Sequence, residues 1–409
     1  MKLKTLDSID LNGKTILYRA PYDIEIKGVN GILEPEDDMR IRSTLPTLEY
    51  LLKENCKIVI LTYVGRPDGV VVEALRTTPH AKRLSELLNH PVLKLDDCIG
   101  EEVEKKISSM QPKDIIMLEN VRFHSEEMVG DPDFAKELCK GKEVIVFDGF
   151  PQAMRIHAST TGIERHLPAV AGIYLQHEVE MLSTLLVSPQ HPFTIIIGGA
   201  KISDKVDAIR NLLQMTDTIL VGGAVANVIL KARGKVLGSS FVEDVFVDKM
   251  KRGKKDWIED AKEILKQAES LGKKIITPVD VVVSDGVSVK TIDINTEEIP
   301  TGWMAFDIGP KTREEFSKII SQSRTIFMNG PMGKFEDEKF SAGSEAIFEA
   351  IKEAKNNLNA ETTIAGGDTI DAARKHGGLE NYSHISLAGG ATLEFLAGKE
   401  LPALVPLVA

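Results

Sequence analysis

Short apolar runs alternate with amphipathic stretches along almost the whole sequence, and this alternation most constrains what the chain can fold into. The stretches TLPTLEYLLKEN and HAKRLSELLNH carry apolar residues at helical spacing. The runs around them are rich in β-branched and apolar residues, as buried strands are: KTILYRA, KIVILTYV, DIIMLEN and EVIVFDG. The pattern predicts βαβ units, and therefore an α/β protein with parallel sheets.

The same pattern resumes after residue 190 in six further runs: FTIIIGG, DTILVGG, KIITPVDVVV, RTIFMNG, TTIAGG and SHISLAGG. Between the two blocks, AGIYLQHEVEMLSTLLVSPQHP predicts one amphipathic helix that joins two domains; a crossover helix within a single sheet is the alternative. A chain of 409 residues suits two domains of about 100–200 residues each. We expect domains over 1–170 and 189–395, a connecting helix over 171–188, and an apolar tail, 396–409, that packs back on the first domain.

Composition narrows the class of function. The formal net charge is −11, whereas proteins that bind nucleic acid usually show a basic footprint, so we expect no nucleic-acid partner. No apolar run approaches the roughly 18 residues of a membrane span, and the N-terminus lacks the apolar segment of a signal peptide. Cys56, Cys98 and Cys139 are widely spaced, which fits a reducing compartment and no metal cluster. We expect a cytoplasmic monomer or small homo-oligomer with small-molecule partners and no membrane partner.

Five strands of the second block run into glycine-rich turns: IIIGGAK, ILVGGAVAN, IFMNGPMG, TIAGGDT and ISLAGGAT. In an open parallel sheet such turns meet at the carboxyl edge, where ligands bind, and helix N-termini there offer N–H groups to phosphate. One turn could use glycine for geometry alone, but five favour a nucleotide or another phosphorylated ligand. The G-x-x-x-x-G-K-[ST] spacing of a P-loop is missing, and no G-x-G-x-x-G follows the first strand, which argues against a nicotinamide dehydrogenase.

Asp368 in GGDT lies beside one of these turns. A carboxylate there would repel phosphate unless a cation lies between them, and hard oxygen ligands together with phosphates suggest Mg²⁺. An N-cap for the following helix is the alternative. Lys201 and Lys205 are four residues apart, so at a helix start they would share one face and suit a triphosphate; a solvated lysine face is the alternative.

The first block instead carries arginines at its strand ends and in the loops that follow: Arg19, Arg40, Arg66, Arg122 and Arg155. Guanidinium groups pair bidentately with carboxylate and phosphate, so several at one sheet edge would form an anion cradle. Surface or salt-bridged arginines are the alternative. An anion-binding domain joined to a phosphate-binding domain indicates phosphoryl transfer, which needs positioning and charge neutralisation rather than a protein nucleophile.

The ordered motifs resemble those of phosphoglycerate kinase over residues 5 to 405. They are RIRSTLPTLEYLL, VGRPDG, MLENVRFHSEE, HASTTGI, GGAKISDKVDAI, PVDVVV, NGPMGKFE, GGDT and GGATLEFLAGKELP. The resemblance implies an α/β fold of two Rossmann-like domains joined by a hinge helix, with the glycerate side first and the Mg-nucleotide side second. It also implies a glycolytic and gluconeogenic enzyme that transfers a phosphoryl group reversibly between ATP/ADP and 3-phosphoglycerate/1,3-bisphosphoglycerate after hinge closure, with Mg²⁺ as cofactor.

The same resemblance implies roles for individual residues. The acidic substrate would be bound by Arg19, Asp23, Arg40, Tyr63, Arg66, Arg122 and Arg155. The transferring phosphoryl group would be stabilised by Arg40, Lys201 and Lys205, and Asp368 would hold Mg²⁺. The nucleotide would be bound by Lys201, Gly222, Gly223, Asn329, Glu336, Gly366, Gly367 and Thr369, with Glu336 at the ribose.

The chain departs from the family pattern mainly on the acceptor side. Pro21 and Asp23 stand where the family has Asp and Asn, and Tyr63 and Met154 each replace a histidine. In the hinge-side Ser-Thr-Gly-Gly-Gly run, this chain has Leu387 and Ala388. A site built to hydrogen-bond a hydroxyl loses strongly when its partners are removed.

Three interpretations therefore remain. The first is the ordinary enzyme, in which Asp23 and Tyr63 make the lost contacts in another way. The second is a related kinase that phosphorylates a different small anionic carboxylate. The third is an inactive nucleotide-binding paralogue, against which the retention of four residues argues: Arg40, Lys201, Lys205 and Asp368.

Overall fold

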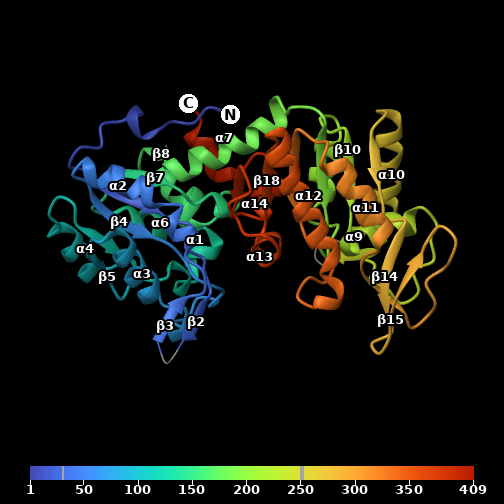
Figure 1. Ribbon diagram of the computed structural model, residues 1–409. Coiled ribbons are helices and arrows are strands. Elements are labelled where there is room, and N and C mark those ends of the chain that lie inside the picture. Colours follow the sequence, from blue (N-terminus) through green and yellow to red (C-terminus); the bar gives the residue numbers. More distant parts are fainter. Residues whose placement is uncertain (30–31, 249–252) are drawn as a thin grey trace. The chain divides into compact units, whose positions relative to one another are not determined.

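The chain folds into two compact units. The computed structural model describes residues 1–29, 32–248 and 253–409 (Figure 1). Unit 1 comprises Met1–Met181 and Glu400–Ala409, and unit 2 comprises Leu182–Lys399. The chain passes from one unit to the other within helix α7 (Ile173–Val187), in the segment where the sequence predicts a connecting helix. Among the described residues, no helix has both the length and the apolar character needed to cross a membrane.

Unit 1 is built on a six-stranded parallel sheet with the order β5-β6-β4-β1-β7-β8. Its strands are β1 (Thr15–Arg19), β4 (Lys57–Leu61), β5 (Val92–Lys94), β6 (Ile115–Met117), β7 (Val144–Phe147) and β8 (Ala169–Ala171). The chain moves from β1 to β4 on one side and later returns to β7 on the other side. The carboxyl end of β1 is therefore a topological switch point, where ligands bind in open parallel sheets.

Helices cover this sheet because their apolar faces bury against it. Leu48 and Leu51 of one helix and Leu84 of another join Ile58 and Val146 of the strands in one buried core. The helices are α1 (Met39–Arg42), α2 (Leu45–Lys53), α3 (Thr78–Leu88), α4 (Glu101–Ser108), α5 (Glu126–Val129) and α6 (Pro132–Cys139). A hairpin of β2 (Ile26–Val29) and β3 (Ile32–Pro35) precedes them, and short turns include η3 (Val121–Phe123), η5 (Ala158–Gly162) and η8 (Pro402–Leu407).

Most of the expected C-terminal tail, Glu400–Ala409, belongs to unit 1, whereas its first residues, 396–399, belong to unit 2. The backbone N–H of Lys4 donates to the Leu407 carbonyl at 2.7 Å, and the N–H of Ala403 donates to the Ala153 carbonyl at 3.0 Å. Ala153 lies just after the carboxyl end of β7, so the tail packs next to a loop that carries predicted substrate-binding residues.

Unit 2 has a second six-stranded parallel sheet, with the order β13-β10-β9-β17-β18-β19. Numbered along the chain, this is the 3-2-1-4-5-6 order of dinucleotide-binding folds. The strands are β9 (Phe193–Ile197), β10 (Thr218–Val221), β13 (Lys274–Ile276), β17 (Thr325–Asn329), β18 (Glu361–Ala365) and β19 (His384–Ser386). The expected Rossmann-like α/β fold is confirmed.

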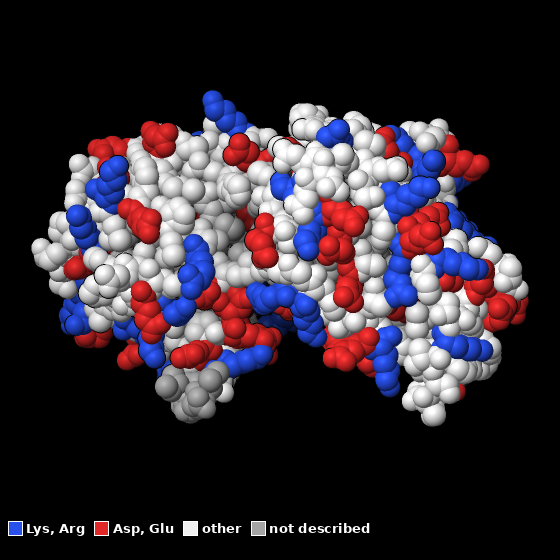
Figure 2. Space-filling model, viewed as in Figure 1, with Lys and Arg blue, Asp and Glu red and all other residues white. Residues whose placement is uncertain are grey.

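Unit 2 also contains seven described helices and a small antiparallel sheet. The helices are α8 (Val206–Leu212), α9 (Gly223–Ala232), α10 (Trp257–Ser270), α11 (Pro310–Ile320), α12 (Ala342–Leu358), α13 (Gly367–Lys375) and α14 (Gly390–Leu396). The antiparallel strands are β14 (Asp280–Ser284), β15 (Val289–Asp293) and β16 (Met304–Ile308), with a separate hairpin of β11 (Val245–Asp248) and β12 (Gly253–Asp256). On the face shown in Figure 2, cationic and anionic side chains are interspersed rather than gathered by sign.

The structure corrects one expected strand, because KIITPVDVVV is not a single element. It divides into β13 in the parallel sheet and β14 in the antiparallel sheet. Pro278 has no N–H for a ladder, and the N–H groups of Val279 and Asp280 donate to Thr312 Oγ1 at 3.0 and 3.1 Å. The chain therefore leaves the parallel sheet at this point, and β14 builds one wall of the cavity described below.

His80 makes unit 1 sensitive to acid. It is fully buried on α3, its Nε2 lies 3.2 Å from the Ile24 carbonyl, and its Nδ1 has no partner among the described residues. Burial lowers the pKa of His80 to about 4. The unfolded chain therefore takes up a proton at higher pH than the folded chain does, and stability is lost as pH falls from about 6.5 to about 4.

We expect His80 alone to lower the free energy of unfolding by about 3 kcal/mol as the pH falls from about 6.5 to about 4. Hydrogen exchange of the α3 and β1 amides should measure this loss of stability. Tryptophan fluorescence cannot, because Trp257 and Trp303 both lie in unit 2. His80→Leu should flatten the pH dependence, whereas a change at the exposed His166 should not. An unchanged slope in His80→Leu would contradict this account.

Candidate active site

Three predicted substrate-binding residues stack at the carboxyl edge of the unit 1 sheet. Arg19 ends β1, Tyr63 follows β4 and Arg122 lies in η3 after β6. The guanidinium carbon of Arg122 lies over the Tyr63 ring, 3.4 Å from its centroid, and that of Arg19 lies 5.5 Å from the same centroid. Parallel strands present their carboxyl ends at one edge, which is why residues so far apart in sequence meet here.

Both arginines are buried, and each has one fully buried nitrogen that lacks a hydrogen-bond partner among the described residues. Arg19 is 0% exposed; its Nε donates to the Ser159 carbonyl at 3.0 Å and its Nη1 to the Ala20 carbonyl, which leaves Nη2 unpaired. Arg122 is 7% exposed; its Nη1 donates to the Gly65 carbonyl at 2.7 Å, and its Nε is unpaired. Buried donors on cations are costly when unpaired, so this pair is suited to an anionic ligand.

Asp23 and Arg40 join the same group through the backbone. The N–H of Gly65 donates to Asp23 Oδ1 at 2.9 Å, and Arg40 Nη1 donates to the Asp23 carbonyl oxygen. Gly65 therefore connects Asp23 to Arg122. Arg66 and Arg155 lie on the same loops but have exposed side chains. The structure thus assembles Arg19, Asp23, Arg40, Tyr63 and Arg122 through direct contacts and leaves the other two arginines on the surface.

Glu127 belongs to this group and was missed at the sequence level. It is buried, and its carboxylate accepts from Ser159 N at 2.8 Å and from Ser159 Oγ at 2.6 Å. Burial raises the pKa of Glu127, while the nearby Arg19 acts in the opposite direction. Its neighbour Glu126 is exposed, so nothing in FHSEE indicates which of the two glutamates enters the site.

Cys98 lies in a mixed group that sequence spacing does not indicate. Donor atoms of Asp97, Cys98 and His124 lie within 4.8 Å of one another. His124 Nε2 lies 2.7 Å from Asp97 Oδ1, and burial raises the pKa of the Cys98 thiol well above its ordinary value. The histidine and the aspartate thus satisfy each other without an ion.

In unit 2, the strand-end glycines let one loop pack against two strand ends. Gly199 N donates to the Pro331 carbonyl, and Gly223 N donates to the Met332 carbonyl, both at 2.8 Å. A Cβ on Gly198 would overlap the Pro331 carbonyl oxygen, and one on Gly222 would overlap Met332 Sδ. Backbone packing therefore requires glycine at position 198, whereas Gly222 packs against a methionine side chain. At Gly367, in contrast, a Cβ would meet no heavy atom within 4 Å, so this position is open.

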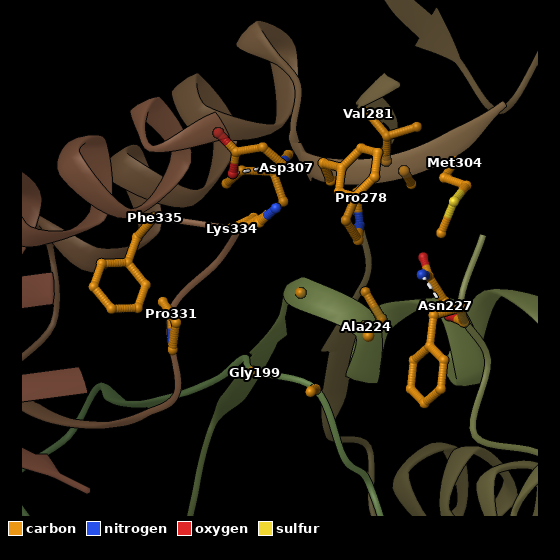
Figure 3. A pocket seen from close by; sticks show the side chains of 18 of the residues that line it. Gly199, Ala224, Asn227, Pro278, Val281, Met304, Asp307, Pro331, Lys334 and Phe335 are labelled. Carbon is orange, nitrogen blue, oxygen red and sulfur yellow. Dashed lines mark hydrogen bonds between the residues drawn. The ribbon is translucent and has the colours of Figure 1, made fainter. Parts of the chain in front are cut away.

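A cavity of about 330 Å³ lies beside these turns. Figure 3 shows Gly199 and Ala224 on one side and the loop from Pro331 to Phe335 on another. The wall formed by Pro278, Val281 and Met304 is apolar, which suits a flat ring system. Of the predicted nucleotide-side residues, the cavity is lined by Gly223, Glu336 and Asp368. Its apolar wall comes from β14 and β16, two strands outside the parallel sheet that the glycine pattern does not indicate.

Asp307 is a buried carboxyl group in the cavity wall. Its two oxygens accept from Ile308 N at 2.9 Å and from Gly343 N at 2.7 Å. Burial raises the pKa of Asp307 to about 7. The carboxylate therefore ties the end of β16 to the start of α12, which encloses the cavity on that side.

The expectation that Lys201 and Lys205 share a helix face is wrong. Helix α8 begins only at Val206, and the turn before it is held by Glu243, which accepts from Ile202 N at 2.7 Å and from Ser203 N at 3.0 Å. Lys201 is exposed, whereas Lys205 is 9% exposed and burial lowers its pKa. Its ammonium nitrogen lies over the Gly199 backbone, 3.7 Å from where a Cβ on that glycine would be.

Asp368 lies in the first turn of α13, and the alternative N-cap role for it is wrong. Gly366 is the N-cap residue, with φ at 92°, and no side chain caps the helix. The exposed Asp368 carboxylate makes no hydrogen bond or ion pair with any residue that the structure describes, and it contributes to the field at Lys205. An exposed, uncommitted carboxylate is the hard oxygen donor that Mg²⁺ prefers.

Two other predicted nucleotide-side residues are used in structural contacts. Thr369 Oγ1 donates to the Ala365 carbonyl and accepts from Gly330 N, both at 2.7 Å. Asn329 Nδ2 donates to the same Ala365 carbonyl at 2.8 Å. These bonds tie the ends of β17 and β18 together, so the two side chains fix the turns that surround the helix start.

Comparison with known proteins agrees with this geometry. The family model "Phosphoglycerate kinase" matches residues 6–399. The chain belongs to the phosphoglycerate kinase family. It is 42% identical over 406 residues to the phosphoglycerate kinase of Pelotomaculum thermopropionicum and 40% identical over 407 residues to that of Moorella thermoacetica, covering 98% of both chains in each case.

Solved phosphoglycerate kinase structures are similar over the full length. The enzyme from Coxiella burnetii superposes with a TM-score of 0.82 and that from Pyrococcus horikoshii with 0.83, each at 32% identity, covering 99% of this chain and 98% of the other. The comparisons with the phosphoglycerate kinase family therefore support an ATP-dependent phosphotransferase that acts on a carboxylate and do not favour a different acceptor.

Substitution by alanine should affect stability differently at a closely packed glycine of unit 2 and at an open one. Gly198→Ala forces a Cβ into the Pro331 carbonyl, so we expect a loss of about 1–3 kcal/mol of unfolding free energy. Gly367→Ala meets open space in a helix, so stability should be unchanged or rise by up to about 1 kcal/mol. Because Gly367 is predicted to lie at the nucleotide phosphates, we expect the added methyl group to lower nucleotide affinity. Tryptophan fluorescence during urea unfolding reports on unit 2, and calorimetric titration with ADP gives the affinity. Equal destabilisation by both substitutions would contradict this distinction.

Proposed function

We propose that this chain transfers a phosphoryl group reversibly between ATP and 3-phosphoglycerate, giving ADP and 1,3-bisphosphoglycerate. The observation that carries the proposal is the pair of buried guanidinium groups, Arg19 and Arg122, each with an unpaired N–H at the carboxyl edge of the unit 1 sheet. Such a pair is suited to a small, multiply charged anion. The match to the phosphoglycerate kinase family over residues 6–399 supports 3-phosphoglycerate as that anion.

On the acceptor side, Arg19 and Arg122 would bind the anionic groups of the substrate, with the exposed Arg66 and Arg155 adding positive charge. Arg40 would approach the transferring phosphoryl group. Tyr63 and Asp23 stand at two of the positions where the chain departs from the family, and they contact Arg122 and Gly65. We therefore propose that these departures preserve an acceptor site of the ordinary kind.

On the nucleotide side, the cavity of unit 2 would receive the base, with Glu336 at the ribose and the turns at Gly223 and Gly366–Gly367 near the phosphates. Lys201 and Lys205 would neutralise the phosphate charge. Asp368 would hold Mg²⁺, which supplies charge neutralisation to the β- and γ-phosphates when bound.

The reaction needs no nucleophile from the protein. A carboxylate oxygen of the acceptor attacks the γ-phosphorus, the bond from that phosphorus to the β–γ bridging oxygen breaks, and ADP leaves with that oxygen. Arg40, Lys201 and Lys205 stabilise charge on the transferring group, which passes in line between the two ligands. Because the acceptor would bind unit 1 and the nucleotide unit 2, transfer requires the units to close about the hinge, and closure also excludes water.

Turnover with 3-phosphoglycerate tests the proposal. The protein is mixed with MgATP and 3-phosphoglycerate, and formation of the acyl phosphate is coupled to its reduction by the matching dehydrogenase. We expect a KM for 3-phosphoglycerate within about 1 μM–1 mM. Binding of MgATP without turnover of 3-phosphoglycerate would overturn the assignment of the acceptor.

Removing a single catalytic cation should slow the reaction strongly. We expect Lys205→Ala and Arg40→Ala each to lower kcat by about 100- to 1,000-fold, because each stabilises charge that develops in the transition state. Steady-state kinetics would measure the loss, and ADP titration should show only modest changes in affinity. Lys105→Ala, on the exposed surface of α4, serves as the control. Wild-type turnover in either active-site variant would remove that residue from the proposed mechanism.

Asp368→Asn should weaken the metal-dependent part of nucleotide binding. We expect the affinity for MgADP to fall at least about tenfold, while the affinity for metal-free ADP stays the same or rises, because the substitution removes a negative charge near the phosphates. Parallel titrations with and without EDTA would separate the two effects. An equal loss in both conditions would mean that Asp368 does not act through Mg²⁺.

We further propose that the enzyme works in the cytoplasm as a monomer or small homo-oligomer. The three cysteines are all buried and free of disulfides, which fits a reducing compartment.

A further inference from the structure

Tyr63 is the place where two buried arginines meet. We propose that Tyr63 is a positioning residue for the acceptor. Its ring holds the guanidinium plane of Arg122, and supports that of Arg19, so that their unpaired N–H groups are aligned for an anionic ligand. This inference rests on the proposed function and concerns how the same site binds its substrate.

The contact with the ring fixes Arg122 without using any of its donors. A guanidinium stacked on an aromatic ring keeps its N–H bonds in its own plane, pointing away from the ring. The guanidinium carbon lies only 3.4 Å from the Tyr63 centroid, so a large tilt would press a guanidinium nitrogen into the ring. The bond from Nη1 to the Gly65 carbonyl then prevents rotation within that plane. Plane and rotation together determine the direction of the unpaired Nε–H.

An aromatic ring also helps two like charges to share a buried site. Burial lowers the pKa of Arg19, and the nearby Arg122 adds to that effect, so both cations need compensating negative potential. Glu127 supplies part of it. The negative face of the Tyr63 ring supplies more, through cation–π contacts that strengthen when they are desolvated. A leucine of similar bulk would fill the space, but it would provide neither the negative aromatic face nor the flat surface on which the guanidinium stacks.

The substitutions Tyr63→Phe and Tyr63→Leu separate the ring from its hydroxyl group. We expect Tyr63→Leu to raise the KM for 3-phosphoglycerate about 10- to 30-fold, the loss expected when a desolvated cation–π contact is removed. The effect on kcat should be smaller, and the KM for MgATP should not change. Tyr63→Phe should retain most of the acceptor affinity. An unchanged acceptor KM in Tyr63→Leu, or an equal defect in Tyr63→Phe, would overturn the inference.

A double-mutant cycle tests whether Tyr63 acts through Arg122. Arg122→Lys keeps the charge but loses the flat guanidinium, so its effect on the acceptor KM should not add to that of Tyr63→Leu. Tyr63→Leu combined with Arg66→Lys is the matched control, and there the two effects should add, because the Arg66 side chain is exposed. Additivity in the Arg122 cycle would show that the ring does not position this arginine.

A binding measurement keeps this inference separate from the proposed function. If the wild-type protein binds MgATP but does not turn over 3-phosphoglycerate, the proposed acceptor is wrong, while the positioning role of Tyr63 still predicts anion binding. With the unit 2 site saturated by MgADP, inorganic phosphate should then protect the wild-type protein and Tyr63→Phe from thermal unfolding, and Tyr63→Leu should lose that protection. Equal protection of all three proteins by phosphate would overturn the inference.

Discussion

The fully buried guanidinium of Arg19 is the constraint on which the acceptor-side site depends. A buried guanidinium needs nearby negative charge and hydrogen-bond acceptors for its N–H groups. The fold supplies negative charge and most of the acceptors. The Ser159 and Ala20 carbonyls accept from it, Glu127 provides negative charge, and Tyr63 provides an aromatic face. Among the described residues, Arg19 Nη2 and Arg122 Nε remain as buried donor nitrogens without a partner. An anionic substrate would supply the missing acceptors.

Unit 2 differs from unit 1, because its proposed nucleotide-binding side is built from backbone turns rather than from buried charged side chains. The strand order places β9 and β17 next to each other at the switch point, and the loop after β17 packs over the end of β9. Only glycine fits where the two backbones approach most closely, at Gly198. The cavity beside this crossing has an apolar wall from β14 and β16, two strands of the small antiparallel sheet that the chain enters after Pro278. In the proposed function, the base, the sugar and the phosphates of the nucleotide would occupy distinct places within this unit.

Much of this could be predicted from the sequence, for a physical reason. Buried parallel strands have continuous apolar runs, so the longer strands of the two parallel sheets and the helices α2 and α3 can be predicted. The meeting of strand-end residues such as Arg19 and Arg122 can be predicted as well. What could not be predicted depends on contacts distant in sequence. Glu127 is indistinguishable from Glu126 until Ser159 packs against it. The turn at Lys201–Lys205 looked helical because nothing nearby reveals that Glu243 holds it open. Strands with mostly exposed or partly exposed side chains, such as β5 and β15, carry too few apolar residues to detect, whereas the equally short but buried β6 is predicted.

The account turns on whether the unpaired N–H groups of the buried arginines receive the acceptor, and side-chain NMR measures this directly. With ¹⁵N-labelled arginine, the Nε–H resonance of Arg122, assigned by its loss in Arg122→Lys, is followed during titration with 3-phosphoglycerate. Arg83 is the internal reference, since its Nε already donates to Asp38 Oδ2 at 3.0 Å. The account predicts that the Arg122 resonance shifts and its exchange with water slows while the Arg83 resonance is unaffected. An Arg122 resonance that stays unchanged at saturating 3-phosphoglycerate would contradict it.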